Sequence, residues 1–204
     1  MPPLDDGVER RFLSLHESRM DVSDADQIEG YPIVFHVPSA DLGGFREVIL
    51  PTAVDRTLRE SLDVRALIDH DPAKIMGRLG AGTLRILKHE QGLWMRNDPP
   101  NTSYAKDIRE SIRRKDVTGM SFAFRVLTES RDGVQGDEWD FSGALPIRYV
   151  HDMRVGEVSV VTFPAYAETT VAMAQRSLAR AREEQTRWTP SRRFHEQWVK
   201  ARVG

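Results

Sequence analysis

The sequence predicts a mixed α+β protein in which a closed or nearly closed antiparallel β-barrel is surrounded by helices and followed by a basic arm. Three observations support this fold class. The chain has 204 residues, of which 40% are hydrophobic and 29% charged, so it can bury a substantial core as one domain. Seven or eight segments have strand-like patterning, against two or three helical ones. Positive charge is concentrated after residue 175.

The charge distribution separates a domain from an arm. Residues 176–204 contain eight Lys or Arg residues and three acids, whereas the whole chain has a net charge of −2. Strand-like patterning ends near residue 174, and a helix-forming run of low apolar content follows until Pro190. We therefore expect a folded domain over residues 1–174 and a helical or disordered arm over 175–204.

The first half of the domain alternates strands with turns. Strands are expected over 12–20 and 27–37, and a short helix over 52–61 follows Pro51. The apolar run 64–68 predicts a strand. Two further strands, 83–88 and 93–96, form a hairpin around residues 90–92.

The second half contains the one long helix expected inside the domain. Tyr104, Ile108 and Ile112 repeat at four-residue spacing, which predicts an amphipathic helix over 101–114, capped by Asn101 or Thr102. The alternating or apolar runs after it predict three more strands, over 117–127, 147–151 and 155–163, with a turn at 131–133.

Composition excludes several classes of site. The chain has no cysteine, which excludes disulfides, thiolate-bound zinc and a thiol nucleophile. We expect no signal peptide, membrane span, cofactor or metal. His70, Asp71 and His89 match no metal-ligand spacing, and residues 77–82 lack the Gly-Lys-Ser/Thr of a phosphate loop. The near-neutral charge makes nucleic acid an unlikely partner for the domain, although the basic arm keeps that alternative open.

His70 is the most informative histidine. It follows the apolar strand 64–68 and lies between Asp69 and Asp71, whose carboxylates favour a protonated imidazole and can orient one ring nitrogen. A histidine at the end of a strand can face a cleft. The alternative is a surface histidine in a polar turn.

Ser121 and Glu157 lie in the two most apolar strands. Alternation places Ser121 and Ala123 opposite a bulky core face, and Gly119 leaves room for a substrate backbone. Glu157 shares a face with Val155 and Ser159 in a strand that is apolar on both sides, so its carboxylate needs a buried partner. A histidine satisfies that need, and so does one of the many arginines. The alternative for Ser121 is an ordinary serine on the solvent-exposed face of an edge strand.

Together these residues make a possible Ser-His-acid set in the chain order His70, Ser121, Glu157. This order differs from that of the nucleophile-elbow hydrolases, and no Gly-x-Ser-x-Gly is present. Triads are defined by geometry, so the order alone excludes nothing.

Several blocks, in order, resemble the prohead (procapsid maturation) proteases of tailed bacteriophages and related prophages. The resemblance covers about residues 10–174 and departs from the usual pattern at Asp69 and at Val155 with Gly156. The matching blocks are Ile28–Phe35, Leu42–Pro51, Ala66–Pro72, Met76–Leu79, Gly82–Ile86, Gly92–Met95, Gly119–Phe124 and Val155–Tyr166.

The resemblance implies a fold similar to herpesvirus assembly proteases and a serine endopeptidase with Ser121 as nucleophile, His70 as base and Glu157 as third member. Arg154 is a candidate to help backbone N–H groups hold the oxyanion. The implied substrates are the scaffold segment of the major capsid protein, or a separate scaffold protein, and the protease itself, with homo-oligomerisation and removal of the arm as further expectations. The implied location is the assembling procapsid in the host bacterial cytoplasm. The alternative function is a catalytically silent assembly scaffold or chaperone.

Overall fold

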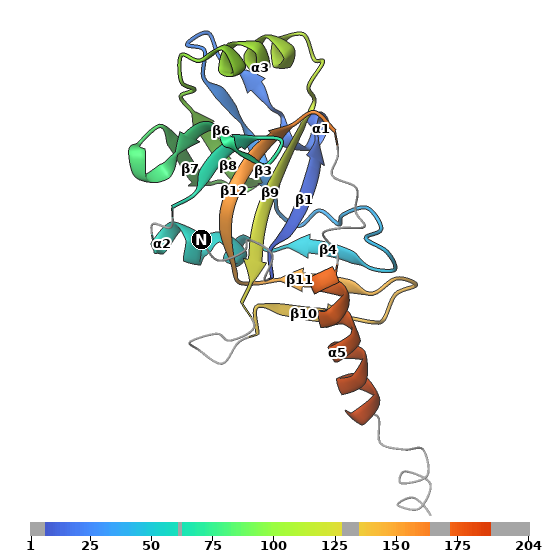
Figure 1. Cartoon of the computed structure of the whole chain (residues 1–204). Helices are drawn as coiled ribbons and strands as arrows, with labels where there is room; N and C mark the ends of the chain where they lie inside the picture. The colour runs from blue at the N-terminus through green and yellow to red at the C-terminus, as the bar shows by residue number, and fades with distance from the viewer. Residues whose placement is uncertain (1–6, 61–62, 128–134, 164–171, 189–204) are drawn as a thin grey trace, which may run out of the picture. The chain divides into compact units, whose positions relative to one another are not determined.

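The computed structural model describes residues 7–60, 63–127, 135–163 and 172–188. Contacts divide the chain into two units, residues 1–171 and residues 172–204. In the second unit the described part is a single helix, α5 (Ala172–Trp188). The first unit contains all the strands described (Figure 1).

The largest sheet of the first unit has five strands, and its central strand β12 pairs with β9 on one side and β5 on the other. In spatial order the strands are β1 (Glu9–Ser14), β9 (Gly119–Val126), β12 (Met153–Val161), β5 (Arg65–Ile68) and β6 (Asp71–Arg78). β12 runs antiparallel to β9 and parallel to β5.

Two smaller sheets complete the strands of the first unit. The four-stranded sheet consists of β2 (Asp21–Val22), β3 (Ile28–Val34), β8 (Gly92–Asn97) and β7 (Leu84–Lys88). The three-stranded sheet consists of β10 (Asp137–Asp140), β11 (Ile147–Val150) and β4 (Arg46–Ile49), with β11 and β4 parallel.

Short helices connect the strands. The four-residue α1 (Leu15–Ser18) and five-residue α2 (Asp55–Arg59) each make about one turn, and η1 (Pro51–Val54) and η2 (Leu79–Ala81) are 3₁₀ turns. The amphipathic helix predicted after Asn101 is α3 (Ser103–Arg113), which buries Ala105, Ile108 and Ile112. Thr102 is its N-cap residue, but its side chain makes no capping hydrogen bond.

The predicted α+β class is confirmed, but the predicted antiparallel barrel is wrong. Within the described residues the ladders form three open sheets, and two strand pairs are parallel. Hydrophobic alternation indicates that a segment is a strand, but it carries no information about the direction of a partner distant in sequence.

The predicted strand over residues 12–20 is also wrong in its second half. β1 ends at Ser14, where the Glu17 carboxylate accepts hydrogen bonds from the Ser14 N–H (2.9 Å) and hydroxyl (2.7 Å). This local contact turns the chain into α1.

Four strands were not predicted: β2, β4, β6 and β10. The turn predicted at 131–133 lies outside the described residues.

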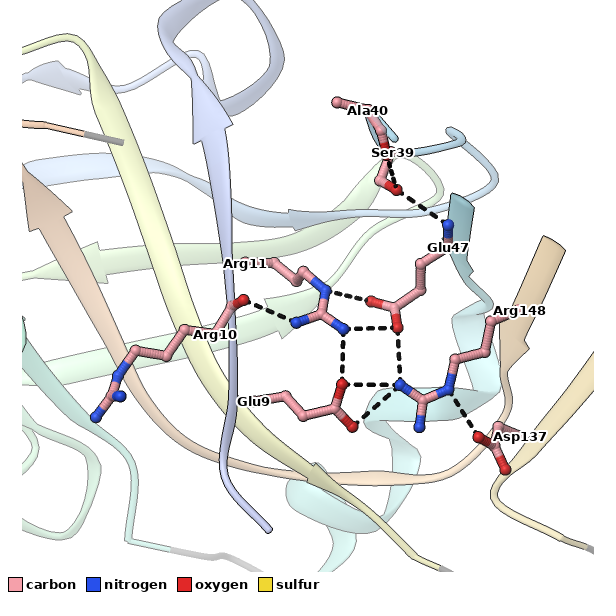
Figure 2. A network of polar contacts seen from close by, with 8 residues as sticks. All are labelled: Glu9, Arg10, Arg11, Ser39, Ala40, Glu47, Asp137 and Arg148. Carbon is pink, nitrogen blue, oxygen red and sulfur yellow. Dashed lines mark hydrogen bonds and ion pairs between the residues drawn. The ribbon is translucent and has the colours of Figure 1, made fainter. Parts of the chain in front are cut away.

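A buried ion-pair network joins β1 to the three-stranded sheet (Figure 2). The Arg11 guanidinium donates to Glu47 (2.8 Å) and Glu9 (2.6 Å), and the Arg148 guanidinium donates to Glu9 (2.8 Å) and Asp137 (2.7 Å). Burial alone lowers the pKa of Arg148, but the carboxylates of Glu47, Glu9 and Asp137 raise it by more, so the net shift is upward. Arg148 therefore stays charged, and its bonds to Glu9 connect β1 to β11.

Candidate active site

The register of the five-stranded sheet aligns the candidate residues in two adjacent rows. Across β1, β9 and β12, one row contains Phe12, Ser121 and Ser159. The neighbouring row contains Arg10, Ala123 and Glu157. Residues two apart on a strand share a face, so both rows project from the same face of the sheet. Ser121 and Glu157 are thereby brought close together.

A β-bulge at Gly156 puts Glu157 on this face. Val155 pairs with Phe124 on the core face, but Glu157 pairs with Ala123 on the opposite face, because the ladder shifts by one residue between them. The expectation that Val155 and Glu157 share a face is therefore wrong. A bulge inserts one residue and re-aims the side chains that follow it.

His70 reaches the same face from the turn between β5 and β6. Asp69 and His70 both have left-handed backbones, with φ of 49° and 59°. The Asp69 carboxylate accepts hydrogen bonds from the Thr162 N–H (2.8 Å) and hydroxyl (2.9 Å), and the Asp69 N–H donates to the Val160 carbonyl (2.9 Å). These bonds fasten the turn to the end of β12. Asp is among the few residue types that tolerate this backbone region.

The imidazole of His70 is held by Glu157. His70 Nδ1 hydrogen-bonds Glu157 Oε1, and the Ser159 hydroxyl donates to Glu157 Oε2 at 2.8 Å. If Nδ1 carries the proton that Glu157 accepts, Nε2 is left as an acceptor, which is the tautomer that a general base needs. Both side chains are largely buried, His70 being 15% and Glu157 13% exposed.

Among the residues that the structure describes, two buried polar atoms of the His70, Ser121 and Glu157 side chains make no hydrogen bond. They are the Ser121 hydroxyl oxygen and His70 Nε2. A hydroxyl needs an acceptor and Nε2 needs a donor, so each atom could supply what the other lacks. Buried polar atoms without partners are rare in folded proteins, and a catalytic role is one of the explanations for them. Hydrogen bonds between nucleophile and base are often long before substrate binds.

Ser121 is completely buried, and β9 lies between β1 and β12, so Ser121 is not a solvent-exposed serine on an edge strand. The space predicted beside Gly119 for a substrate backbone is occupied: a Cβ on Gly119 would lie 2.1 Å from Cε2 of the Phe12 ring. Phe12 is also the cross-strand partner of Ser121. Access to the hydroxyl therefore requires side chains on this face to move.

Arg154 lies away from the other candidates. Its cross-strand partner is Arg125, four residues along β9 from Ser121, a separation of roughly 13 Å at about 3.3 Å per residue. Its guanidinium lies 3.4 Å from Glu60. The structure therefore does not bring Arg154 to the nucleophile.

Sequence reasoning missed two polar contacts of Glu157. Ser159 was noted only as a neighbour on the strand, and Arg10, whose Nε lies 3.9 Å from Glu157 Oε1, was not considered. Ser159 could have been found from its i+2 spacing to Glu157. Arg10 is 147 residues from Glu157 in the chain, and only the pairing of β1 with β9 brings it near.

Other features lie outside this site. The described residues contain no group of three or more His, Cys, Asp or Glu residues placed to hold a metal ion. None of the helices described is long and apolar enough to cross a membrane. A cavity of about 280 Å³ lies beside β1, and its lining includes Leu13, Leu42, Ile49 and Phe122. None of Ser121, His70 and Glu157 lines this cavity.

A search of the curated proteins and a search of the solved structures find nothing similar to this chain. A model of the caudovirus prohead serine protease family matches residues 14–184, which is most of the chain and includes His70, Ser121 and Glu157. The chain therefore belongs to the caudovirus prohead serine protease family.

Proposed function

We propose that the chain is a serine endopeptidase in which Ser121 is the nucleophile, His70 the general base and Glu157 the acid that orients the imidazole. The observation that carries this proposal is the pair of buried, unpartnered atoms, Ser121 Oγ and His70 Nε2, beside a histidine whose Nδ1 is bonded to Glu157. Family membership supports the same reaction class.

The mechanism follows from these contacts. His70 Nε2 takes the Ser121 proton as the hydroxyl oxygen attacks a peptide carbonyl carbon, and the carbonyl π electrons move to oxygen. Glu157 stabilises the imidazolium, which then gives the proton to the leaving amine as the C–N bond breaks. Water, deprotonated by His70, hydrolyses the acyl-enzyme and releases Ser121. Backbone N–H groups hold the oxyanion.

The proposed substrates are the scaffold segment of the major capsid protein, or a separate scaffold protein, and the protease itself. The proposed place of action is the inside of the assembling procapsid in the bacterial host. The family description supports a role in prohead maturation. The basic arm over 175–204 is the proposed autoprocessed segment.

The test is intact-mass spectrometry of the chain co-expressed with the major capsid protein of the same phage or prophage. Wild type should yield trimmed capsid protein, and Ser121→Ala should yield only full-length chains. Ser159→Ala is the comparison variant, because Ser159 lies beside Ser121 in the same row and is also buried; it should still trim the capsid protein, but more slowly, since it loses only a hydrogen bond to Glu157. Trimming by Ser121→Ala at the wild-type rate would contradict the assignment.

The alternative is a catalytically silent assembly factor with the same fold. The complete burial of Ser121 favours it, since a nucleophile that no substrate can reach is inactive. The same experiment separates the two functions. Identical full-length masses for wild type and Ser121→Ala in assembled shells would favour the assembly factor.

A further inference from the structure

Arg10 is the positive charge that the sheet places beside the candidate catalytic acid. It lies on β1 directly across from Ala123, which in turn lies across from Glu157. Ala123 has only a methyl group, so the long Arg10 side chain can extend over β9. Its Nε comes to 3.9 Å from Glu157 Oε1.

Arg10 and Arg11 are neighbours on β1 with opposite surroundings. Their side chains extend to opposite sides of the strand (Figure 2). The Arg11 guanidinium is fully engaged in the buried network by Glu9 and Glu47. Arg10 Nε, by contrast, is buried and makes no hydrogen bond within the described residues. A buried N–H without a partner costs roughly 1–3 kcal/mol, so fold stability alone does not explain Arg10.

Charged residues close to the His70–Glu157 pair in sequence or register come from four elements. Asp69 lies in the β5–β6 turn, Asp71 begins β6, Arg10 lies on β1, and Arg65 on β5 is the cross-strand partner of Glu157. Arg65 is 44% exposed and pairs with Asp63 at 2.8 Å. Among the described residues, Arg10 is the only arginine or lysine whose side chain lies within ion-pair distance of the Glu157 carboxylate.

We propose that Arg10 is a positioning residue that keeps Glu157 ionised and directed at His70, and thereby sets the lower pH limit at which Ser121 is reactive. This inference rests on the proposed function. A cation at this distance disfavours uptake of a proton by the His70–Glu157 pair. Without it, the imidazolium forms at higher pH, and His70 cannot accept the Ser121 proton.

The test uses the assembled particle and measures, as a function of pH, the rate at which a fluorophosphonate labels Ser121, followed by intact mass. Arg10→Met and Arg10→Gln remove the charge, and Arg10→Lys keeps it. In both uncharged variants the midpoint of the acidic limb should rise by about 0.5–1 pH unit. In Arg10→Lys it should stay near the wild-type midpoint. Arg85→Met is the control for loss of an exposed arginine in another sheet.

The outcomes separate this inference from the proposed function. If wild type is not labelled at Ser121, the proposed function fails. If wild type is labelled and the uncharged variants keep its midpoint, only the role of Arg10 fails. If the midpoint rises equally in Arg10→Lys, the proposed role of Arg10 also fails, because a variant that keeps the positive charge then behaves like those that lose it. Should Arg10→Met not fold, Arg10→Gln gives the same comparison, with circular dichroism to verify folding.

Discussion

At the scale of single residues, the site depends on side chains whose chemistry was evident in the sequence and on contacts that were not. His70 between two acids, Ser121 beside Ala123 and Glu157 in an apolar strand were each singled out from local sequence. What local sequence could not provide was the meeting of His70 with Glu157, which is 87 residues away. That contact requires β5 to pair with β12, and strand pairing between distant segments leaves no local signal.

Ser159 is expected to support the reaction without taking part in it. Ser159→Ala removes the hydrogen bond to Glu157 Oε2, so the carboxylate loses one of its two bonded partners. A hydrogen bond to a charged group is worth roughly 1.5–3 kcal/mol, so kcat should fall about tenfold or more. Peptide cleavage kinetics measure this fall. A variant with no cleavage at all would instead indicate that Ser159 is the nucleophile.

Asp69 is expected to matter through its backbone conformation and its bonds to Thr162. Asp69→Ala deprives the Thr162 N–H and hydroxyl of their acceptor and puts alanine at a φ of 49°. The free energy of unfolding should fall by roughly 1–3 kcal/mol in urea titrations, and cleavage should weaken with it. Asp69→Asn is the matched control, because Asn tolerates this region and retains an oxygen acceptor. Equal losses in both variants would contradict this explanation.

At the scale of elements, irregularities of the strands position the site. Because of the bulge at Gly156, the side chains of Val155 and Glu157 project from opposite faces of β12. The sequence predicts this strand to within a few residues but not the bulge, because the alternation of apolar and polar residues describes only regular strands. For the same reason the strand predicted over 12–20 continues past Ser14, where β1 ends. Hairpin β7–β8 was predicted well, because its turn is local.

Deleting Gly156 is expected to abolish cleavage. The deletion restores a regular ladder, and Glu157 must then either turn to the core face or force a shift of the whole strand. Gly156→Ala is the matched control: the nearest atom to the added methyl is the Ala123 carbonyl oxygen at 3.9 Å, so there is room for it. Capsid protein trimming by the deletion variant at the wild-type rate would show that the bulge does not position Glu157.

At the scale of the whole molecule, the buried network connects β1, the edge strand of the five-stranded sheet, to the three-stranded sheet. Glu9 and Arg11 belong to β1, Glu47 to β4 and Arg148 to β11. Nothing in the sequence identified these four charges as buried, because three of the four pairs among them join residues that are 36, 101 and 139 positions apart. The barrel expectation failed at this scale too, since sheet order depends on pairings between distant strands.

Loss of one network charge is expected to destabilise the fold strongly. Arg148→Met leaves the carboxylates of Glu9, Glu47 and Asp137 buried with one guanidinium fewer, which should lower the free energy of unfolding by about 3–5 kcal/mol. Arg154→Met removes an exposed pair with Glu60 and should cost less than about 1 kcal/mol. Urea denaturation compares the two, and similar losses would contradict the importance of burial.

The central claim is that Ser121 is activated by His70 and Glu157, and peptide mapping after fluorophosphonate treatment tests it most directly. The assembled particle is the sample of choice, because access to Ser121 requires side chains on its face of the sheet to move. We expect one adduct, on the peptide containing Ser121, and its loss in His70→Ala. An adduct on Ser159, or labelling of Ser121 that is unchanged in His70→Ala, would contradict the account.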